Sequence, residues 1–261
     1  MGATTVSRIR STFFVPILMC LLVATTVYGQ GRGGGGRGAA APKTPKESAS
    51  IDLTGYWAAV VTTDWRWRMT VPPKGDYQGI PINPAAKTLA DTWDPAKDEA
   101  AGEQCRSYGA PNIMKVPGRL HITWQDDKTL KLETDAGKQT RVFSFGPAAG
   151  SAGDWQGVSE ASWDAVSFGN GLFSRNVPSG ALKVVTTELK PGYLQKNGVP
   201  YSANGVLTEY FDVINDASGE FLVDSITFED PMYLMAKYET AVTFKKQADA
   251  AGWNPTACTS R

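Results

Sequence analysis

The residues with the clearest chemical potential are the only histidine of the chain and two charged residues that follow it. His121, Glu133 and Arg141 fall in three consecutive strand-like segments. If both connecting turns have three residues, His121 faces Glu133 and Glu133 faces Arg141, so the three form a row; Arg119 would face Asp135 beside it. Such a row could supply a His–carboxylate acid/base pair with an arginine that holds an oxyanion. It could equally be a solvent-facing charge ladder.

A single histidine excludes more chemistry than it suggests. Zinc sites with two or three histidines and the two-histidine iron triad cannot be built from one chain of this composition. No Gly-x-Ser-x-Gly elbow is present, so a serine nucleophile lacks its usual context. We expect no metal and no cofactor.

Tryptophan is the second chemical signal. Residues 55–69 alternate between apolar and polar positions, which predicts one long strand with Trp57, Trp65 and Trp67 on the same face. Trp124 lies on the apolar face of a later segment. These rings could fill an ordinary core, or they could line a cavity for an apolar or planar ligand.

Four acidic residues lie on or beside two other candidate strands. They could form a glycosidase-like carboxylate pair or a calcium site, but exposed strand and turn positions are the default interpretation. The four residues are Glu209, Asp212, Glu229 and Asp230.

The N-terminal residues predict export. Arg8 and Arg10 precede an apolar stretch at residues 13–27, and a cleavage site follows near Gly29, so residues 1–29 read as a signal peptide. Cys20 lies inside the apolar stretch, where a lipid-anchor cysteine is an alternative. We expect a secreted or periplasmic protein without an integral membrane span after processing.

A tether and one domain follow the signal peptide. Residues 30–47, rich in Gly, Arg and Pro, predict a disordered linker, and residues 48–261 form the domain. The linker and signal peptide hold six basic residues and one acidic residue, so the domain has a net charge of −5. A mildly acidic domain has no electrostatic reason to bind nucleic acid.

Two cysteines remain in the domain. In an oxidising compartment Cys105 and Cys258 most simply form a disulfide. A nucleophilic cysteine is the alternative, although only one histidine is available to activate it.

Short alternating segments dominate the domain and predict an all-β fold. One helical segment is expected from Pro84 to Gly102, and little other helix is available to cross over a parallel sheet. An antiparallel barrel or sandwich follows. The expected strands after the first are 119–125, 129–135, 139–145, 159–163, 182–189, 206–214, 221–228 and 238–245.

Certain residues also carry a resemblance. Gly55-Tyr56-Trp57 resembles the Gly-x-Trp motif with which lipocalin and calycin barrels close one end, although Lys245 and Lys246 stand where an arginine usually covers the ring. Most of residues 105–244 resembles a group of poorly characterised secreted bacterial proteins that look calycin-like. The segments that carry this second resemblance are Gly157-Val158-Ser159, Trp163-Asp164, Leu182-Lys183-Val184-Val185-Thr186, Leu207-Thr208-Glu209-Tyr210-Phe211 and Glu229-Asp230-Pro231.

These observations favour a lipocalin-like (calycin) barrel that binds a small apolar or aromatic molecule outside the cytoplasm. Two alternatives stay open. One is a cofactor-free isomerase, hydratase or lyase that uses His121, Glu133 and Arg141. The other is a periplasmic interaction module without a pocket.

Overall fold

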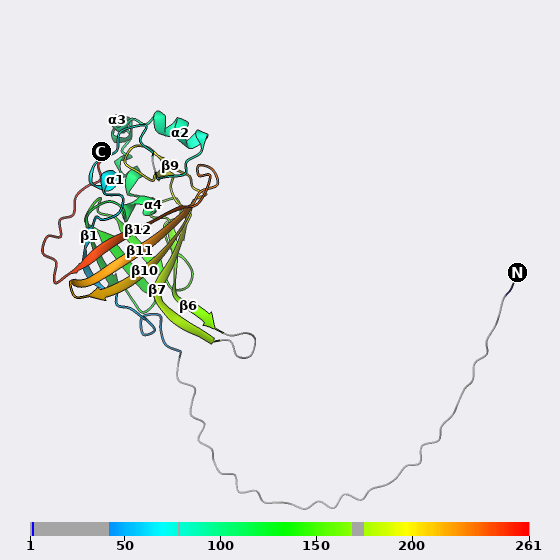
Figure 1. Ribbon diagram of the computed structural model, residues 1–261, viewed down its shortest axis with the longest axis vertical. Coiled ribbons are helices and arrows are strands. Elements are labelled where there is room, and N and C mark those ends of the chain that lie inside the picture. The colour runs from blue at the N-terminus through cyan, green and yellow to red at the C-terminus, as the bar shows by residue number, and fades with distance from the viewer. Residues whose placement is uncertain (1, 3–41, 78, 169–174, 261) are drawn as a thin grey trace, which may run out of the picture. The chain divides into compact units, whose positions relative to one another are not determined.

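The computed structural model describes residues 2, 42–77, 79–168 and 175–260 (Figure 1). The predicted signal peptide (apart from residue 2), its cleavage site, Cys20 and the tether up to residue 41 lie outside these ranges. Within the described part, no helix is both long and apolar enough to cross a lipid bilayer.

Nine strands form a closed barrel. Hydrogen-bonded neighbours run in the order β4, β3, β2, β1, β12, β11, β10, β7, β6, and β6 pairs back to β4. The bounds are β1 Gly55–Val60, β2 Arg119–Trp124, β3 Thr129–Thr134, β4 Thr140–Ser144, β6 Val158–Phe168, β7 Arg175–Thr187, β10 Val206–Asp216, β11 Gly219–Glu229 and β12 Tyr238–Gln247.

The barrel is mixed, which corrects the antiparallel prediction. Every barrel pairing is antiparallel except the last, where β4 and β6 run parallel with Phe143 opposite Ser159. Residues 145–157 separate these strands and include β5, Ala149–Gly150, which pairs with β6. A connection between two parallel strands needs about a dozen residues or more, and this segment is long enough. The chain therefore reaches β6 without a connecting helix.

Strand alternation fills the barrel with side chains. On β2, β3 and β4 the buried residues alternate with more exposed ones, and the buried side chains of the described barrel are mainly Leu, Ile, Val and Phe. The most completely buried apolar side chains include Trp57, Leu132, Leu182, Val184, Leu207, Leu222 and Phe228.

The long first strand predicted for residues 55–69 is wrong. Strand β1 ends at Val60, and residues Trp65–Met69 form the short helix α1. Strand β2 begins at Arg119 opposite Ala58, so the chain beyond Val60 has no partner on that side. Asp64 then adopts a left-handed conformation with φ 53°, which turns the chain into the helix. The alternation of side chains could not reveal where the partner strand stops.

The predicted helical segment is confirmed as two helices, α2 Pro84–Asp91 and α3 Pro95–Ala100. Each begins with a proline, and its N-cap side chain (Asn83 or Asp94) accepts a backbone hydrogen bond. Pro95 lacks the N–H that a continuous helix would need. In Figure 1 helices α1 to α4 gather toward one end of the barrel, hereafter the helical end. The remaining elements are η1 Gln104–Tyr108, α4 Ala110–Ile113, β8 Gly192–Tyr193 and β9 Pro200–Tyr201.

The end of the predicted tether packs against the barrel. Thr44 and Glu47 exchange side-chain and backbone hydrogen bonds, which closes a turn. The indole N–H of Trp163 donates to the carbonyl of Pro45 at 2.8 Å. The compact unit that contains the barrel begins at Pro42.

The predicted disulfide is confirmed. Cys105 and Cys258 are bonded, with their Cα atoms 5.1 Å apart. The bond joins η1 to the C-terminal segment over a separation of 153 positions. It therefore fixes the C-terminal segment at the helical end.

Candidate functional site

The structure brings His121 and Glu133 together, as the predicted register requires. They are opposite on β2 and β3, with Nδ1 of His121 3.3 Å from Oε2 of Glu133. The imidazole stacks on Tyr56 at 4.2 Å between ring centroids, and Lys131 also contacts Glu133. Both side chains lie on the outer face of the barrel, about a quarter exposed, so they do not face the barrel interior.

Arg141 is not part of this row, and the prediction that it faces Glu133 is wrong. Glu133 is opposite Thr140, one residue earlier than expected. Gly137 and Lys138 both take left-handed conformations in the turn between β3 and β4, with φ 75° and 51°. A shift of one residue moves every side chain of a strand to the opposite face. Arg141 therefore points into the barrel, and the three candidate catalytic residues do not form one group.

Inside the barrel Arg141 forms a buried polar cluster. Its Nη1 and Nη2 donate to the two carboxylate oxygens of Glu209 at 2.7 and 2.5 Å. Nη2 also donates to Thr186, whose hydroxyl shares a 2.8 Å hydrogen bond with Ser159. Arg141 and Glu209 have side chains with no exposed surface. Two parallel charge-assisted bonds make this a strong, geometrically specific pair.

Asp224 adds a second carboxylate to the cluster. It is fully buried, and neither of its oxygens has a hydrogen-bond donor among the described residues. Burial raises the pKa of Asp224 well above its usual value; the nearby Glu209 carboxylate adds to this shift, and Arg141 offsets it only in part. Asp224 is therefore protonated where an ordinary aspartate is ionised. The proton lets the carboxyl group donate to Glu209.

The default interpretation of the four acidic residues is thus wrong for two of them. Glu209 lies in the cluster, and Asp230 is buried, where it accepts hydrogen bonds from Ser202 and from the backbone of Met232. Asp212 is exposed, and Glu229 pairs with Lys237 on the surface. Among the described residues, no three His, Cys, Asp or Glu side chains come close enough together to hold a metal ion.

The four candidate tryptophans occupy different environments. Trp57 is fully buried core; its indole N–H donates to the carbonyl of Leu53, and the Lys246 ammonium lies 4.8 Å from its ring centroid. Trp124 is the last residue of β2, and its ring stacks on Phe145. Trp65 is 64% exposed. The remaining ring, Trp67, lines a pocket.

This pocket lies at the helical end and has a volume of about 360 Å³. We call it the α1 pocket, because α1 and the residues just after it form one wall. Its size falls within the range of small-molecule sites. Apolar and aromatic lining comes from Trp67, Met69, Val71, Tyr108, Val116, Pro117 and Tyr238, and polar lining from Asp64, Arg68, Asn112, Lys115, Gln195 and Lys196.

Arg68 is the least satisfied polar group of the α1 pocket. Its Nε donates to the backbone carbonyl of Lys115 at 2.9 Å, which fixes the guanidinium against the pocket wall. Both Nη atoms are buried and have no hydrogen-bond partner among the described residues. Burial lowers the pKa of Arg68, and Asp64 opposes this effect without forming an ion pair. A buried cation with free donors favours an anionic partner.

Lys115 is a second buried cation of the pocket. Its Nζ donates to the carbonyl of Leu194 at 2.7 Å and lies 3.3 Å from the hydroxyl of Tyr238. Within the described ranges no carboxylate is in ion-pair contact with it. Burial lowers the pKa of Lys115 to about 7; Asp64 opposes the shift and Arg68 adds to it. The amine is therefore half neutral near pH 7.

Two phenols complete the polar part of the pocket. Burial raises the pKa of Tyr238, so its hydroxyl stays protonated at neutral pH. Burial alone would also raise the pKa of Tyr108, but hydrogen bonds from Lys196, at 2.7 Å, and Thr259 outweigh burial and lower it. Both phenols can thus exchange hydrogen bonds with a polar ligand.

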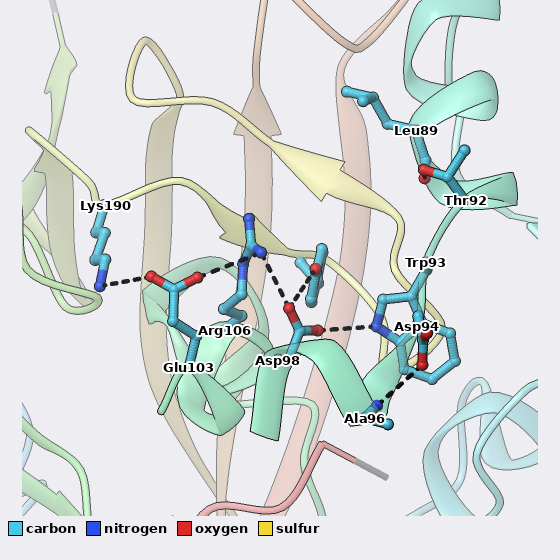
Figure 2. Close-up of polar contacts among 10 residues, drawn as sticks. Leu89, Thr92, Trp93, Asp94, Ala96, Asp98, Glu103, Arg106 and Lys190 are labelled. Atoms are coloured by element: carbon cyan, nitrogen blue, oxygen red, sulfur yellow. Dashed lines mark hydrogen bonds and ion pairs between the residues drawn. The ribbon is translucent and has the colours of Figure 1, made fainter. Parts of the chain in front are cut away.

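A second hollow, of about 480 Å³, lies beside α3. Figure 2 shows the chain of charges next to it, in which Lys190, Glu103, Arg106 and Asp98 pair in turn and Trp93 donates to Asp98. Because these charges already pair with one another, this hollow has less need of a charged ligand than the α1 pocket.

Sequence reasoning missed Arg68 and Lys115. Arg68 falls at a polar position of the alternating segment 55–69, which predicts an exposed strand residue, whereas the structure places it in α1. Lys115 lies between Met114 and Val116, both apolar, and a lysine within an apolar segment is a weak signal of burial. Only Trp67 of the predicted ligand-binding set reaches the pocket.

Comparison with known proteins gives no family: no family model matches the chain, and no curated protein or solved structure matches it.

Proposed function

We propose that this protein is an exported small-molecule-binding protein, and that its ligand is an apolar or aromatic molecule with an acidic group, bound in the α1 pocket. The observation that carries the proposal is the pair of buried, unpartnered Nη atoms of Arg68. Leaving charged donors buried without an acceptor is costly, so a ligand that supplies an oxyanion gains the full value of those hydrogen bonds.

The walls of the α1 pocket support the apolar part of the ligand. Trp67 and Met69 come from α1, while Val116 and Pro117 come from the segment that follows α4. Apolar area leaving water on such walls contributes about 25 cal/mol per Å². The acidic group would then fix the orientation of the ligand rather than supply most of the affinity.

Export and a lipocalin-like barrel are parts of the same proposal. The basic and apolar N-terminal residues and the Cys105–Cys258 disulfide favour an oxidising compartment. Lys246 over the ring of Trp57 supports a likeness to the covered Gly-x-Trp of calycin barrels. Nine strands with one parallel pairing depart from an all-antiparallel barrel, so the likeness concerns the closed end more than the whole topology.

The test compares two naphthalene dyes of similar shape, anionic 1-anilinonaphthalene-8-sulfonate and neutral N-phenyl-1-naphthylamine. We expect both dyes to bind and the anionic dye to bind more tightly. The variant R68Q should weaken the anionic dye by about 1.5–3 kcal/mol, the value of hydrogen bonds to a charged group, and leave the neutral dye nearly unchanged. Binding is measured from the increase in dye fluorescence and from the quenching of the protein's tryptophan fluorescence.

The matched control is R66Q on the same helix. Arg66 is largely exposed and pairs with Asp76, so its loss removes the same formal charge without touching the buried donors. Equal effects of R66Q and R68Q would reduce the result to general electrostatics. Absence of stoichiometric binding of either dye to the folded protein would contradict the proposal.

A further inference from the structure

Lys115 has a placement that binding alone does not explain. It follows α4, and its backbone is held at both sides, because its N–H donates to Asn112 and its carbonyl accepts from Arg68. Lys115 lines the α1 pocket, and its Nζ contacts the carbonyl of Leu194 and the hydroxyl of Tyr238, another lining residue. A single buried amine is thus held in one position beside the proposed anion site.

The charged and titratable groups around this amine favour its neutral form. Among the residues that the structure describes, Arg68 and Lys196 are the other cations that line the pocket, and Asp64 is the one carboxylate. The Asp64 carboxylate already accepts a hydrogen bond from Thr240. Burial outweighs the attraction of Asp64, which is why the pKa of Lys115 falls to about 7. A desolvated lysine next to another cation is the arrangement that activates an amine as a nucleophile.

We propose that Lys115 forms an imine with small 2-oxo acids whose carboxylate is bound by Arg68 and whose side chain is apolar or aromatic. The inference rests on the proposed function, because it uses the same pocket and the same anion site. A 2-oxo acid carries its carbonyl on the carbon next to the carboxylate. Arg68, which contacts the backbone of Lys115, can therefore hold the acid close to the amine.

The step conserves atoms and electrons without a further reactant. The lone pair of neutral Nζ forms a bond to the carbonyl carbon, and the carbonyl π electrons move to its oxygen. That oxygen takes a proton, for which the hydroxyl of Tyr238, protonated at neutral pH and 3.3 Å from Nζ, is the nearest donor. The proton that Nζ releases passes through Tyr238 to the same oxygen, which leaves as water, and a protonated imine remains. One proton from solvent restores the Tyr238 hydroxyl.

The test uses the full mature protein with its disulfide intact, phenylpyruvate as the probe, and cyanoborohydride to reduce any imine. Each trapped imine adds the mass of the free probe acid less one oxygen atom. We expect one adduct, which peptide mapping places on Lys115 of the unaltered protein. Near pH 7 about half of Lys115 is neutral against roughly one in 3,000 ordinary lysines, a ratio of about 1,000, so trapping there should be at least about 100-fold faster than at any other lysine.

Variants and a matched ligand separate the possible outcomes. K115M should abolish the adduct, whereas K131M, which alters a lysine that contacts Glu133 away from the α1 pocket, should retain it. The 2-hydroxy analogue phenyllactate keeps the carboxylate but has a hydroxyl in place of the keto group. It should therefore displace the anionic dye as phenylpyruvate does, but it should form no adduct. Because the adduct is mapped on the unaltered chain, the result does not depend on whether K115M folds.

Two failures are distinguishable. If the anionic dye does not bind the folded protein, the proposed function fails together with this inference; if the dye binds and neither acid displaces it, the imine proposal alone is overturned. If phenylpyruvate displaces the dye but no adduct forms on Lys115, or adducts spread evenly over surface lysines, the imine proposal alone is overturned.

Discussion

Arg141 on β4 and Glu209 on β10 form a two-bond ion pair inside the barrel, with side chains that have no exposed surface. The two residues are 68 positions apart in the chain, and their strands are separated by β6 and β7 in the barrel order. The pair therefore links distant parts of the wall through the core. A buried pair of this kind costs desolvation energy, so its main effect is to make the loss of either partner severe.

Removing one partner of this pair should destabilise the fold strongly. We expect R141M to lower the free energy of unfolding by about 3–5 kcal/mol, because it leaves Glu209 buried beside Asp224 without a cation. The double variant R141M/E209M should lose much less. Urea unfolding measures both. The surface pair Lys246–Glu220 provides the control, since K246M should change stability by no more than about 1 kcal/mol. A double variant no better than R141M would contradict this account.

The raised pKa of Asp224 should make stability fall as pH rises. The folded state keeps a proton that the unfolded chain has released, so the contribution of Asp224 is fully present below the ordinary aspartate pKa of 3.8. It is lost as pH rises through the higher folded value. D224N keeps a donor toward Glu209 and cannot ionise. We therefore expect its stability relative to the unaltered protein to increase from about pH 5 to about pH 8.

Thermal unfolding at the two pH values tests the Asp224 account, and the comparison between variant and unaltered protein cancels the titration of other groups. D212N is the matched control, because Asp212 is exposed on the same sheet. A stability difference for D224N that does not change with pH would show that Asp224 is ionised in the folded state.

Reduction of the Cys105–Cys258 disulfide should lower stability by up to about 4–5 kcal/mol, the chain-entropy limit for a loop of 153 positions. It should also weaken dye binding. The bond anchors the segment that includes Thr259, and Thr259 contacts the hydroxyl of Tyr108 in the α1 pocket. Urea unfolding and dye titration, with and without reductant, measure the two effects. Unchanged binding after reduction would separate the disulfide from the pocket.

Replacement of His121 by alanine should leave ligand binding unchanged. His121 and Glu133 lie on the outer face of the barrel and do not line the α1 pocket. The contact of His121 with Glu133 should contribute at most about 1 kcal/mol to the free energy of unfolding. Its stacking on Tyr56 should contribute at most about 1.5 kcal/mol. Dye titration beside a melting curve checks both statements. Weaker binding by folded H121A would place the ligand elsewhere than in the α1 pocket.

Local patterns were sufficient for much of the fold. Side-chain periodicity and turn residues predict strands β2, β3 and β4 and the pairing of His121 with Glu133. Proline and capping residues predict helices α2 and α3. The disulfide followed from counting the cysteines that remain after residue 47, of which there are two. These features depend on neighbours close in sequence or on elimination, and both can be read from one chain.

The candidate site depended on information that a linear pattern does not contain. A change of one residue in the β3–β4 turn decided that Arg141 faces inward, and the point where β2 begins decided that Arg68 lies on a helix. Burial of Lys115 required α1, α4 and β12 to come together at one end of the barrel. The sequence by itself predicted a β-rich domain and a cysteine pair, both of which the structure contains. Only the tertiary structure decided which charges lost their water, because desolvation depends on what packs around a group and not on its neighbours in the chain.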